Sequence, residues 1–255
     1  MIVAIIQARM DSSRLPNKVM LPLEGKSVLW HVVDRVRNSR IVDSVVVATS
    51  DHNSNDAIRN FCKANGIECI SGSEDDVLDR YYKVVNHYNL EDSDHVVRIT
   101  ADCPLIDPSI VDDVINYHLL SGSDYTSNTI EPTFPDGLDC EVVKVSALKQ
   151  AWKEAKMKSE REHVTLYIYS HPELFEILNY AGKQNLSHMR WTLDESEDYQ
   201  FIKQIYQELA KSRETFNMQD VLALLERSPD LSTINARFAR NEGLAKSLRD
   251  DGLMH

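Results

Sequence analysis

The segment "QARMDSSRLPNK" near the N-terminus carries side chains that can bind phosphate. A guanidinium group can hold two phosphate oxygens at once, and an ammonium group acts as a point charge. These groups, with hydroxyls and backbone N–H groups, suit a triphosphate. A basic surface loop is the alternative, but the loop directly follows the apolar segment "IVAIIQA", which favours binding. The side chains concerned are Arg9, Ser12, Ser13, Arg14 and Lys18.

This loop does not match the common glycine-rich phosphate sites. Neither G-x-x-x-x-G-K-[ST] nor G-x-G-x-x-G occurs in the chain. The sequence therefore indicates neither a P-loop nor a Rossmann-type nicotinamide or flavin site.

Two carboxylates follow predicted strands or precede predicted helices. Asp102 ends the segment "RITAD", and a single carboxylate there suits Mg²⁺, which keeps several waters and takes substrate oxygens as ligands. A helix N-cap is the alternative role, and it fits Asp107 better than Asp102. Asp194 in "RWTLDESED" could cap the following helix, bind the same metal, or do both. The acids after it are interpreted only as first-turn charges that favour the helix dipole: Glu195, Glu197 and Asp198.

Two later segments hold polar side chains for a second ligand. In "FPDGLDCEVV", Asp139 and Glu141 alternate with Cys140 on a predicted strand, so both acids lie on one face and could bind hydroxyls or an amine. "SEREHVTLYI" contains Arg161, Glu162 and His163. Taken alone, that second segment is more typical of a solvated helix face.

The first hundred residues alternate between strand and helix patterns. Short apolar strands are predicted at 2–8, 42–51, 67–73 and 94–102, and helices at 27–39, 55–66 and 75–88. This alternation predicts an α/β fold, a three-layer structure with a mostly parallel sheet covered on both faces. In such sheets ligands bind beyond the carboxyl ends of the strands, where the polar loops above begin.

The pattern changes after about residue 120. "DYTSN", "LDCEVVKVS" and "FEILNYA" indicate irregular or antiparallel strands, and helices are predicted at 147–156, 160–171, 197–211 and 217–229. No linker or repeat divides the chain. We therefore expect a single domain over 1–255, with an α/β part (1–120), an extension (121–235) and a peripheral tail (236–255).

The charge of the chain limits its partners. Its net charge of −12 argues against nucleic acid as the main partner. Residues 1–40 nevertheless hold seven Lys and Arg against three acids, a local +4 that leaves −16 for the rest, as suits a small anion bound at one place. Three of these cations are interpreted as a solvated helix face: Arg35, Arg37 and Arg40.

Cysteine spacing and hydropathy indicate the compartment. The four cysteines form no C-x-x-C pair, and no apolar run reaches the length of a membrane span. We expect reduced thiols, a cytoplasmic protein and no membrane insertion.

Seven segments in order resemble the cytidylyltransferase-like family typified by a spore coat polysaccharide biosynthesis protein. They are "IIQARMDSSRLPNKVM", "VVVATSD", "GSEDDVLDRYY", "RITADCPLIDP", "PDGLDCEV", "EREHVT" and "RWTLD". The chain is more distantly similar to the CMP-KDO and CMP-acylneuraminate synthetases. The resemblance implies a nucleotide-diphospho-sugar transferase (GT-A-like) fold, and homodimers are common among such relatives.

The resemblance also implies roles for individual residues. CTP would bind in 1–120, with Arg9, Arg14 and Lys18 as catalytic cations. Asp102 would bind Mg²⁺, joined by looser analogy by Asp194. The implied nucleotide-binding residues are Ala8, Arg9, Ser13, Arg14, Lys18, Arg80 and Asp102, and the implied acceptor-binding residues are Asp136, Asp139, Glu141, Arg161, Glu162 and His163.

The sequence departs from the family pattern near the phosphate-binding loop. Asn17 stands where the family usually has Gly, and Asp11 where it often has a small residue. An acid at that place would weaken phosphate binding unless it points away or meets a metal.

These observations predict a Mg²⁺-dependent nucleotidyltransferase that moves CMP from CTP to an acidic sugar or similar small anion and releases pyrophosphate. Surface polysaccharide or glycoconjugate precursor synthesis is the expected setting. A GT-A glycosyltransferase is one alternative, although "TADCPL" has one acid where such enzymes usually have Asp-x-Asp. A non-catalytic nucleotide-binding module is the other.

Overall fold

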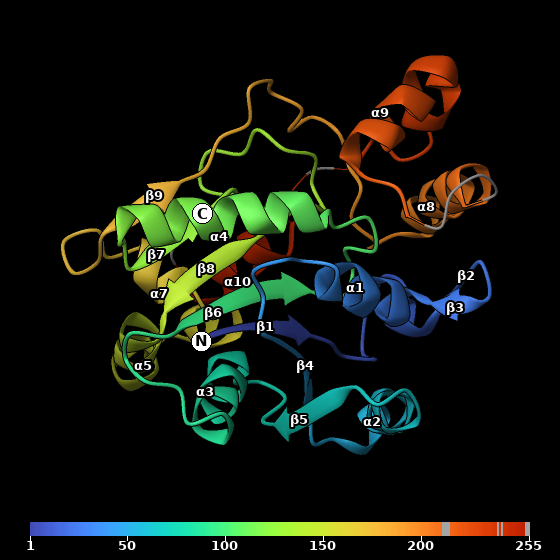
Figure 1. Cartoon of the computed structure of the whole chain (residues 1–255). Coiled ribbons are helices and arrows are strands. Elements are labelled where there is room, and N and C mark those ends of the chain that lie inside the picture. The colour runs from blue at the N-terminus through green and yellow to red at the C-terminus, as the bar shows by residue number, and fades with distance from the viewer. Residues whose placement is uncertain (211–214, 239, 241, 253–255) are drawn as a thin grey trace.

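The computed structural model describes residues 1–210, 215–238, 240 and 242–252. A seven-stranded sheet in the order β5-β4-β1-β6-β8-β7-β9 lies at its centre (Figure 1). β5, β4, β1 and β6 are parallel, whereas β8 pairs antiparallel with both β6 and β7. The strands are β1 (Ile2–Gln7), β4 (Ser44–Ser50), β5 (Glu68–Gly72), β6 (His95–Thr100), β7 (Tyr125–Ser127), β8 (Glu141–Lys144) and β9 (Ile177–Asn179), with a separate hairpin of β2 (Pro22–Leu23) and β3 (Lys26–Ser27).

Strand β1 is buried on both faces, as its unbroken apolar sequence predicts. Successive side chains of a strand point to opposite faces, so Ala4 and Ile6 join one hydrophobic cluster while Val3 and Ile5 join the other. These two clusters are the two cores of the molecule, one on each side of the sheet.

Helices cover both faces of the sheet. In Figure 1, α4 lies on one side of β6 and β8, and α3 and α5 lie on the other. The helices of the first core are α1 (Val28–Arg37), α2 (Asp56–Ala64), α4 (Pro108–Ser121), α8 (Ser196–Leu209) and α9 (Met218–Arg227), and those of the second are α3 (Val77–His87), α5 (Val145–Glu154) and α7 (Leu166–Tyr169). The predicted three-layer α/β fold with a mostly parallel sheet is confirmed.

Short elements complete the described chain. They are η1 (Lys18–Met20), η2 (Asn53–Asn55), α6 (Lys158–Glu162), η3 (Pro229–Thr233) and α10 (Glu242–Asp250). The predictions of a helix reaching 211 and of a tail to 255 extend beyond the described residues, at 211, 239, 241 and 253–255. Within the described part of the chain, no helix has the length and apolar composition to cross a membrane.

The predicted helix at 160–171 is wrong, because α6 and α7 are separate helices. Between them Val164 adopts φ 54°, a left-handed conformation that costs a β-branched residue energy and ends helical hydrogen bonding. The break directs Thr165 to Glu141, whose carboxylate accepts a hydrogen bond from the Thr165 hydroxyl at 2.5 Å.

The interpretation of Arg35 as a solvated residue is also wrong. Its Nε donates to the carbonyl of Ile106 and its Nη2 to that of Phe216, each at 2.7 Å. Arg35 is buried, while Arg37 and Arg40 are exposed as expected. The guanidinium group of Arg35 thus joins α1 to the segments that precede α4 and α9.

Candidate active site

A cavity of about 1280 Å³ opens at the carboxyl ends of β1 and β6. Gln7 ends β1 and Thr100 ends β6, and both line the cavity. Because β8 runs in the opposite direction, its first residue, Glu141, lies at the same edge. The cavity therefore lies at the sheet edge where ligands were expected.

The phosphate-binding loop predicted after β1 is held by backbone contacts. The N–H of Met10 donates to Asn55 Oδ1 at 2.8 Å, and the N–H of Asn17 donates to the Met10 carbonyl at 3.2 Å. Asn17 has φ 59°, a left-handed conformation that Gly and Asn adopt readily. This conformation accounts for Asn at a position where the family usually has Gly.

Asp11, the second departure in this loop, does not line the cavity. It is exposed, and its Oδ2 accepts a hydrogen bond from the hydroxyl of Ser54 at 2.6 Å. The carboxylate therefore points away from the cavity that the loop cations face.

Lys18 brings together the two carboxylates predicted to bind metal. Its Nζ lies 2.6 Å from Asp102 Oδ2 and 2.7 Å from Asp194 Oδ1. The lysine is buried at the start of η1, Asp102 follows β6, and Asp194 precedes α8. Two carboxylates from distant parts of the chain thus converge on one cation.

Charge–charge contacts shift the pKa values of Lys18 and Asp102 in this group. Burial alone would lower the pKa of Lys18, but the charges of Asp102 and Asp194 outweigh it and raise that pKa above its usual value. Burial would likewise raise the pKa of Asp102, but the Lys18 ammonium group lowers it to about 2. The Asp102 carboxylate is therefore ionised at neutral pH.

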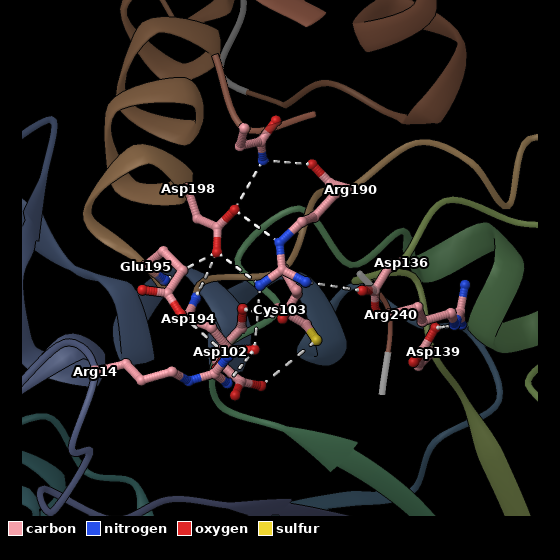
Figure 2. Close-up of polar contacts among 12 residues, drawn as sticks. Arg14, Asp102, Cys103, Asp136, Asp139, Arg190, Asp194, Glu195, Asp198 and Arg240 are labelled. Atoms are coloured by element: carbon pink, nitrogen blue, oxygen red, sulfur yellow. Dashed lines mark hydrogen bonds and ion pairs between the residues drawn. The ribbon is translucent and has the colours of Figure 1, made fainter. Parts of the chain in front are cut away.

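Arg14 forms ion pairs with two carboxylates, those of Asp194 and Glu195 (Figure 2). Its Nη2 lies 3.1 Å from Asp194 Oδ2, and its Nη1 lies 3.1 Å from Glu195 Oε1. Glu195, and not Asp194, occupies the N-cap position of α8. The Asp194 carboxylate can therefore pair with the cations of the cavity. Asp107 caps α4 as predicted, because it accepts a hydrogen bond from the Ser109 N–H at 2.9 Å.

A third cation, Arg190, also contacts Asp194 (Figure 2). Its guanidinium group makes two hydrogen bonds of 2.9 Å to Asp198, and it lies 3.4 Å from Asp194 and 3.5 Å from Asp136. Asp198 is fully buried and also accepts from Asn235 Nδ2 at 2.9 Å. The interpretation of Asp198 as a mere first-turn charge is therefore wrong.

Comparison with known proteins identifies the molecule. The family model described as cytidylyltransferase matches residues 3–227. The chain belongs to the cytidylyltransferase family. It is therefore a nucleotidyltransferase, and the resemblance that its motifs indicated is confirmed.

Three relatives illustrate the relationship. This cytidylyltransferase is 37% identical over 239 residues to the spore coat polysaccharide biosynthesis protein SpsF of Bacillus subtilis, covering 91% of this chain and 97% of that one. It is 35% identical over 114 residues to 3-deoxy-manno-octulosonate cytidylyltransferase of Geobacter sulfurreducens, covering 45% and 44%. A solved cytidylyltransferase of Leptospira borgpetersenii superposes with a TM-score of 0.86 at 29% identity, covering 94% of this chain and 99% of that one.

The remaining residues predicted for the nucleotide also line the cavity of the cytidylyltransferase. Ala8, Arg9 and Ser13 come from the loop after β1, and Arg80 comes from α3. Arg80 is 3% exposed, burial lowers its pKa, and its Nε has no hydrogen-bond partner among the described residues. Buried polar groups nearly always have a hydrogen-bond partner, so an unpartnered N–H on a residue that lines the cavity makes Arg80 a candidate to contact a ligand.

The acids of "PDGLD" lie across the cavity from this loop. Arg240 Nη2 donates to Asp139 Oδ1 at 2.5 Å (Figure 2). The Asp136 N–H donates to the Met189 carbonyl at 2.9 Å, and the Asp136 carbonyl accepts from the Trp191 N–H at 2.6 Å. Burial, and then the charge of Asp139, raises the pKa of Asp136 to about 7. This turn is therefore joined to the segment that leads to Asp194.

Glu141 lines the cavity, but its carboxylate already has three partners within the protein. Its carboxylate pairs with Arg98 and accepts from the hydroxyls of Tyr125 at 2.6 Å and Thr165 at 2.5 Å. Glu141 is 6% exposed. These contacts hold Arg98 and Glu141 in place across β6 and β8.

The three residues of "REH" separate in the structure. Arg161 does not line the cavity, because its Nε and Nη2 bind Asp76 Oδ2 at 2.9 and 2.6 Å. Glu162 and His163 do line it, and both contact the hydroxyl of Ser247, at 3.1 and 2.9 Å. Glu162 and His163 therefore share one hydroxyl partner, Ser247, at the cavity.

Three cavity arginines were not expected from the sequence: Arg98, Arg190 and Arg249. Arg98 stands inside an otherwise apolar strand, and Arg190 stands four residues before Asp194. Either position is a signal, since a cation in a buried segment needs a partner. Arg249 lies in the polar C-terminal stretch, where nothing in the sequence sets it apart.

Proposed function

We propose that this cytidylyltransferase transfers CMP from CTP to an acidic sugar or a related small anion, with release of pyrophosphate, in the synthesis of a surface polysaccharide precursor. One observation carries the proposal most directly. Lys18, Asp102 and Asp194 converge at the edge of the sheet, beside a loop that presents Arg9 and Arg14 to the same cavity. The likeness to SpsF supports the proposed setting.

The donor set at this point suits Mg²⁺. Asp102 and Asp194 offer carboxylate oxygens that already converge on a single cation, the ammonium group of Lys18. Mg²⁺ prefers such hard oxygen ligands and takes few of them from protein. Asp102 and Asp194 would hold the ion, which when bound withdraws negative charge from phosphate oxygens.

The cations of the loop after β1 would neutralise the remaining negative charge of the CTP phosphates. An acceptor oxygen attacks the α-phosphorus of CTP, the bond from that phosphorus to the bridging oxygen breaks, and pyrophosphate leaves. Arg9, Arg14 and Lys18 would neutralise the β- and γ-phosphates and the departing pyrophosphate. Such a reaction needs positioning and charge rather than a covalent nucleophile, as in other transfers at phosphorus.

A pyrophosphate-release assay tests the proposal. The enzyme is supplied with each of the four nucleoside triphosphates and with acidic sugars, sugar phosphates and phosphonates, in Mg²⁺ and then in excess EDTA. We expect pyrophosphate only with CTP, an acidic acceptor and Mg²⁺. Release of a nucleoside mono- or diphosphate from a nucleotide sugar would instead identify a glycosyltransferase, and CTP binding without turnover a regulatory module.

A matched pair of variants connects the activity to the site. Asp102→Asn removes a proposed metal ligand, whereas Asp113→Asn changes an exposed acid outside the cavity. Asp102→Asn should reduce turnover at least a hundredfold and weaken Mn²⁺ binding measured by electron paramagnetic resonance. Equal metal binding by the two variants would refute the role of Asp102.

A further inference from the structure

The C-terminal helix forms one wall of the active-site cavity. Five of its residues line the cavity: Leu244, Ala245, Ser247, Arg249 and Asp250. The family model that identifies the cytidylyltransferase ends at residue 227, before this helix begins. The wall is thus built from a part of the chain that the family match does not cover. We call Arg240, α10 and Asp251 the C-terminal wall.

Three residues hold the C-terminal wall against the proposed acceptor side of the cavity. Arg240 binds Asp139 at 2.5 Å, and Ser247 contacts Glu162 and His163. Asp251 Oδ2 accepts from the N–H of Ser159 at 2.8 Å. Asp139, Glu162 and His163 belong to the motifs "PDGLDCEV" and "EREHVT", which were assigned to the second substrate, and Ser159 directly precedes the latter motif. The wall therefore encloses the place proposed for the acceptor.

Four of the Lys and Arg side chains that line the cavity already neutralise a carboxylate: Arg14, Lys18, Arg98 and Arg190. Lys158 and Arg249 differ, since both are exposed, line the cavity and form no ion pair with another described residue. Arg9 and Arg80 also lack one, but they belong to the loop and helix proposed for the nucleotide.

The hydrogen bond between Ser159 and Asp251 brings together the two segments that carry Lys158 and Arg249. Lys158 directly precedes Ser159, whose N–H binds Asp251, and Asp251 follows Arg249 by two residues. Glu162 and Asp250 also line this part of the cavity, and the Glu162 carboxylate accepts from Ser247. Two cations beside polar acceptors suit a ligand with one anionic group and several hydroxyls.

We propose that Lys158 and Arg249 bind the anionic group of the acceptor, so that the C-terminal wall selects acidic over neutral acceptors. The inference rests on the proposed function. An arginine fork holds a carboxylate or a phosphate through two parallel hydrogen bonds, and the lysine adds a point charge. Glu162 and Asp250 accept from acceptor hydroxyls.

Steady-state kinetics with matched acceptors test this proposal. The acidic probes are 3-deoxy-manno-octulosonate, N-acetylneuraminate, glucuronate, glucose 6-phosphate and 2-aminoethylphosphonate, and the neutral probes are glucose and N-acetylglucosamine. The variants are Lys158→Ala and Arg249→Ala. Their controls are Lys153→Ala and Arg227→Ala, two exposed cations outside the cavity. Thermal unfolding verifies that all four variants fold.

We expect each cavity variant to raise the KM for the acidic acceptor about tenfold or more, because a hydrogen-bonded charge is lost. The KM for CTP should stay within twofold, and Arg249→Lys should recover part of the loss. The carboxylate probes and the two phosphorus probes distinguish which anionic group the site prefers.

The other outcomes separate the two proposals. If the wild type uses an acidic acceptor and Lys158→Ala and Arg249→Ala leave its KM unchanged, the wall inference is wrong and the proposed function stands. If only a neutral acceptor reacts, both the wall inference and the acidic acceptor of the proposed function are wrong, and only transfer of CMP with release of pyrophosphate stands. If no probe yields pyrophosphate and none binds by calorimetry in the presence of CTP, both proposals are overturned.

Discussion

The ammonium group of Lys18 lies 2.6 Å from a carboxylate oxygen of Asp102, a residue 84 positions away in the chain. The same ammonium group reaches Asp194, 176 positions away. A single buried cation thus joins the loop after β1, the end of β6 and the segment before α8. The site is assembled by electrostatic attraction as well as by the sheet.

Replacement of Lys18 by methionine should destabilise the folded enzyme. The substitution leaves Asp102 poorly solvated and without its cation, and breaking such a pair costs about 3 kcal/mol. Urea unfolding at pH 7 measures the difference from the wild type. Lys153→Met, on the exposed surface of α5, is the control and should change stability by less than about 0.5 kcal/mol.

The cost of Lys18→Met should depend on pH. The folded-state pKa of Asp102 is about 2, below the value of about 3.9 in an unfolded chain. Its contribution is therefore complete above the unfolded pKa and is lost as the pH falls through the folded one. The stability difference between wild type and variant should shrink from pH 4 towards pH 2. An equal difference at pH 7 and pH 2.5 would contradict the pairing.

Arg14→Ala should impair catalysis more than folding. The Arg14 side chain is 35% exposed, so its ion pairs with Asp194 and Glu195 contribute less than about 1 kcal/mol to stability. Loss of a positioned cation at the leaving pyrophosphate should lower kcat about a hundredfold. Single-turnover kinetics and thermal unfolding give the two numbers, with Arg37→Ala as the control. A large loss of thermal stability with unchanged turnover would refute the assignment.

Arg190→Met should be among the most destabilising single changes at the site. It leaves the fully buried Asp198 without its guanidinium partner, at a cost of about 3–5 kcal/mol. The double variant Arg190→Met with Asp198→Leu should recover much of this loss, because no unpaired charge then remains buried. A double-mutant cycle by urea unfolding measures the coupling, and additive effects would show that the pair is not coupled.

The ionisation of Asp136 should make the wild type less stable as the pH rises from about 3.9 to about 7. Its folded-state pKa is about 7, above the value of about 3.9 in an unfolded chain. Between these values the folded state binds more protons, so stability falls with rising pH. The Asp136→Asn variant has no carboxyl group at this position, so its stability lacks this dependence on pH. The free energy of unfolding of the wild type, measured by urea unfolding, should therefore fall relative to that of Asp136→Asn between pH 4.5 and pH 8. A difference that does not change with pH would show that the pKa of Asp136 is not raised.

The fold, and the gathering of the proposed nucleotide-binding residues at one edge of the sheet, were predictable because they depend on local pattern. Apolar strands alternate with amphipathic helices, and the end of each strand marks the sheet edge. Lys18 and Asp102 each follow such a strand, so their meeting could be inferred. Asp194 could not be assigned between cap and ligand, since the choice depends on Glu195 occupying the cap.

The proposed acceptor side was less predictable because it depends on long-range contacts. Asp198 has the sequence position of an ordinary first-turn charge, and its burial depends on Arg190 and on the distant Asn235. The break at Val164 is invisible to helical periodicity, because nothing in the pattern forbids a continuous helix there. Arg249 belongs to a polar stretch whose position is set by Arg240 and Asp251.

The reversed direction of β8 has an evolutionary consequence. The residues that enter the cavity from this strand are the first ones, so the preceding loop delivers them, while CTP is proposed to bind the loops that leave the parallel strands. Substitutions in the loop before β8 therefore fall in a different segment of the chain from Lys18 and Asp102. An antiparallel strand at this place lets evolution alter the proposed acceptor side while the segments proposed to bind CTP keep their sequence.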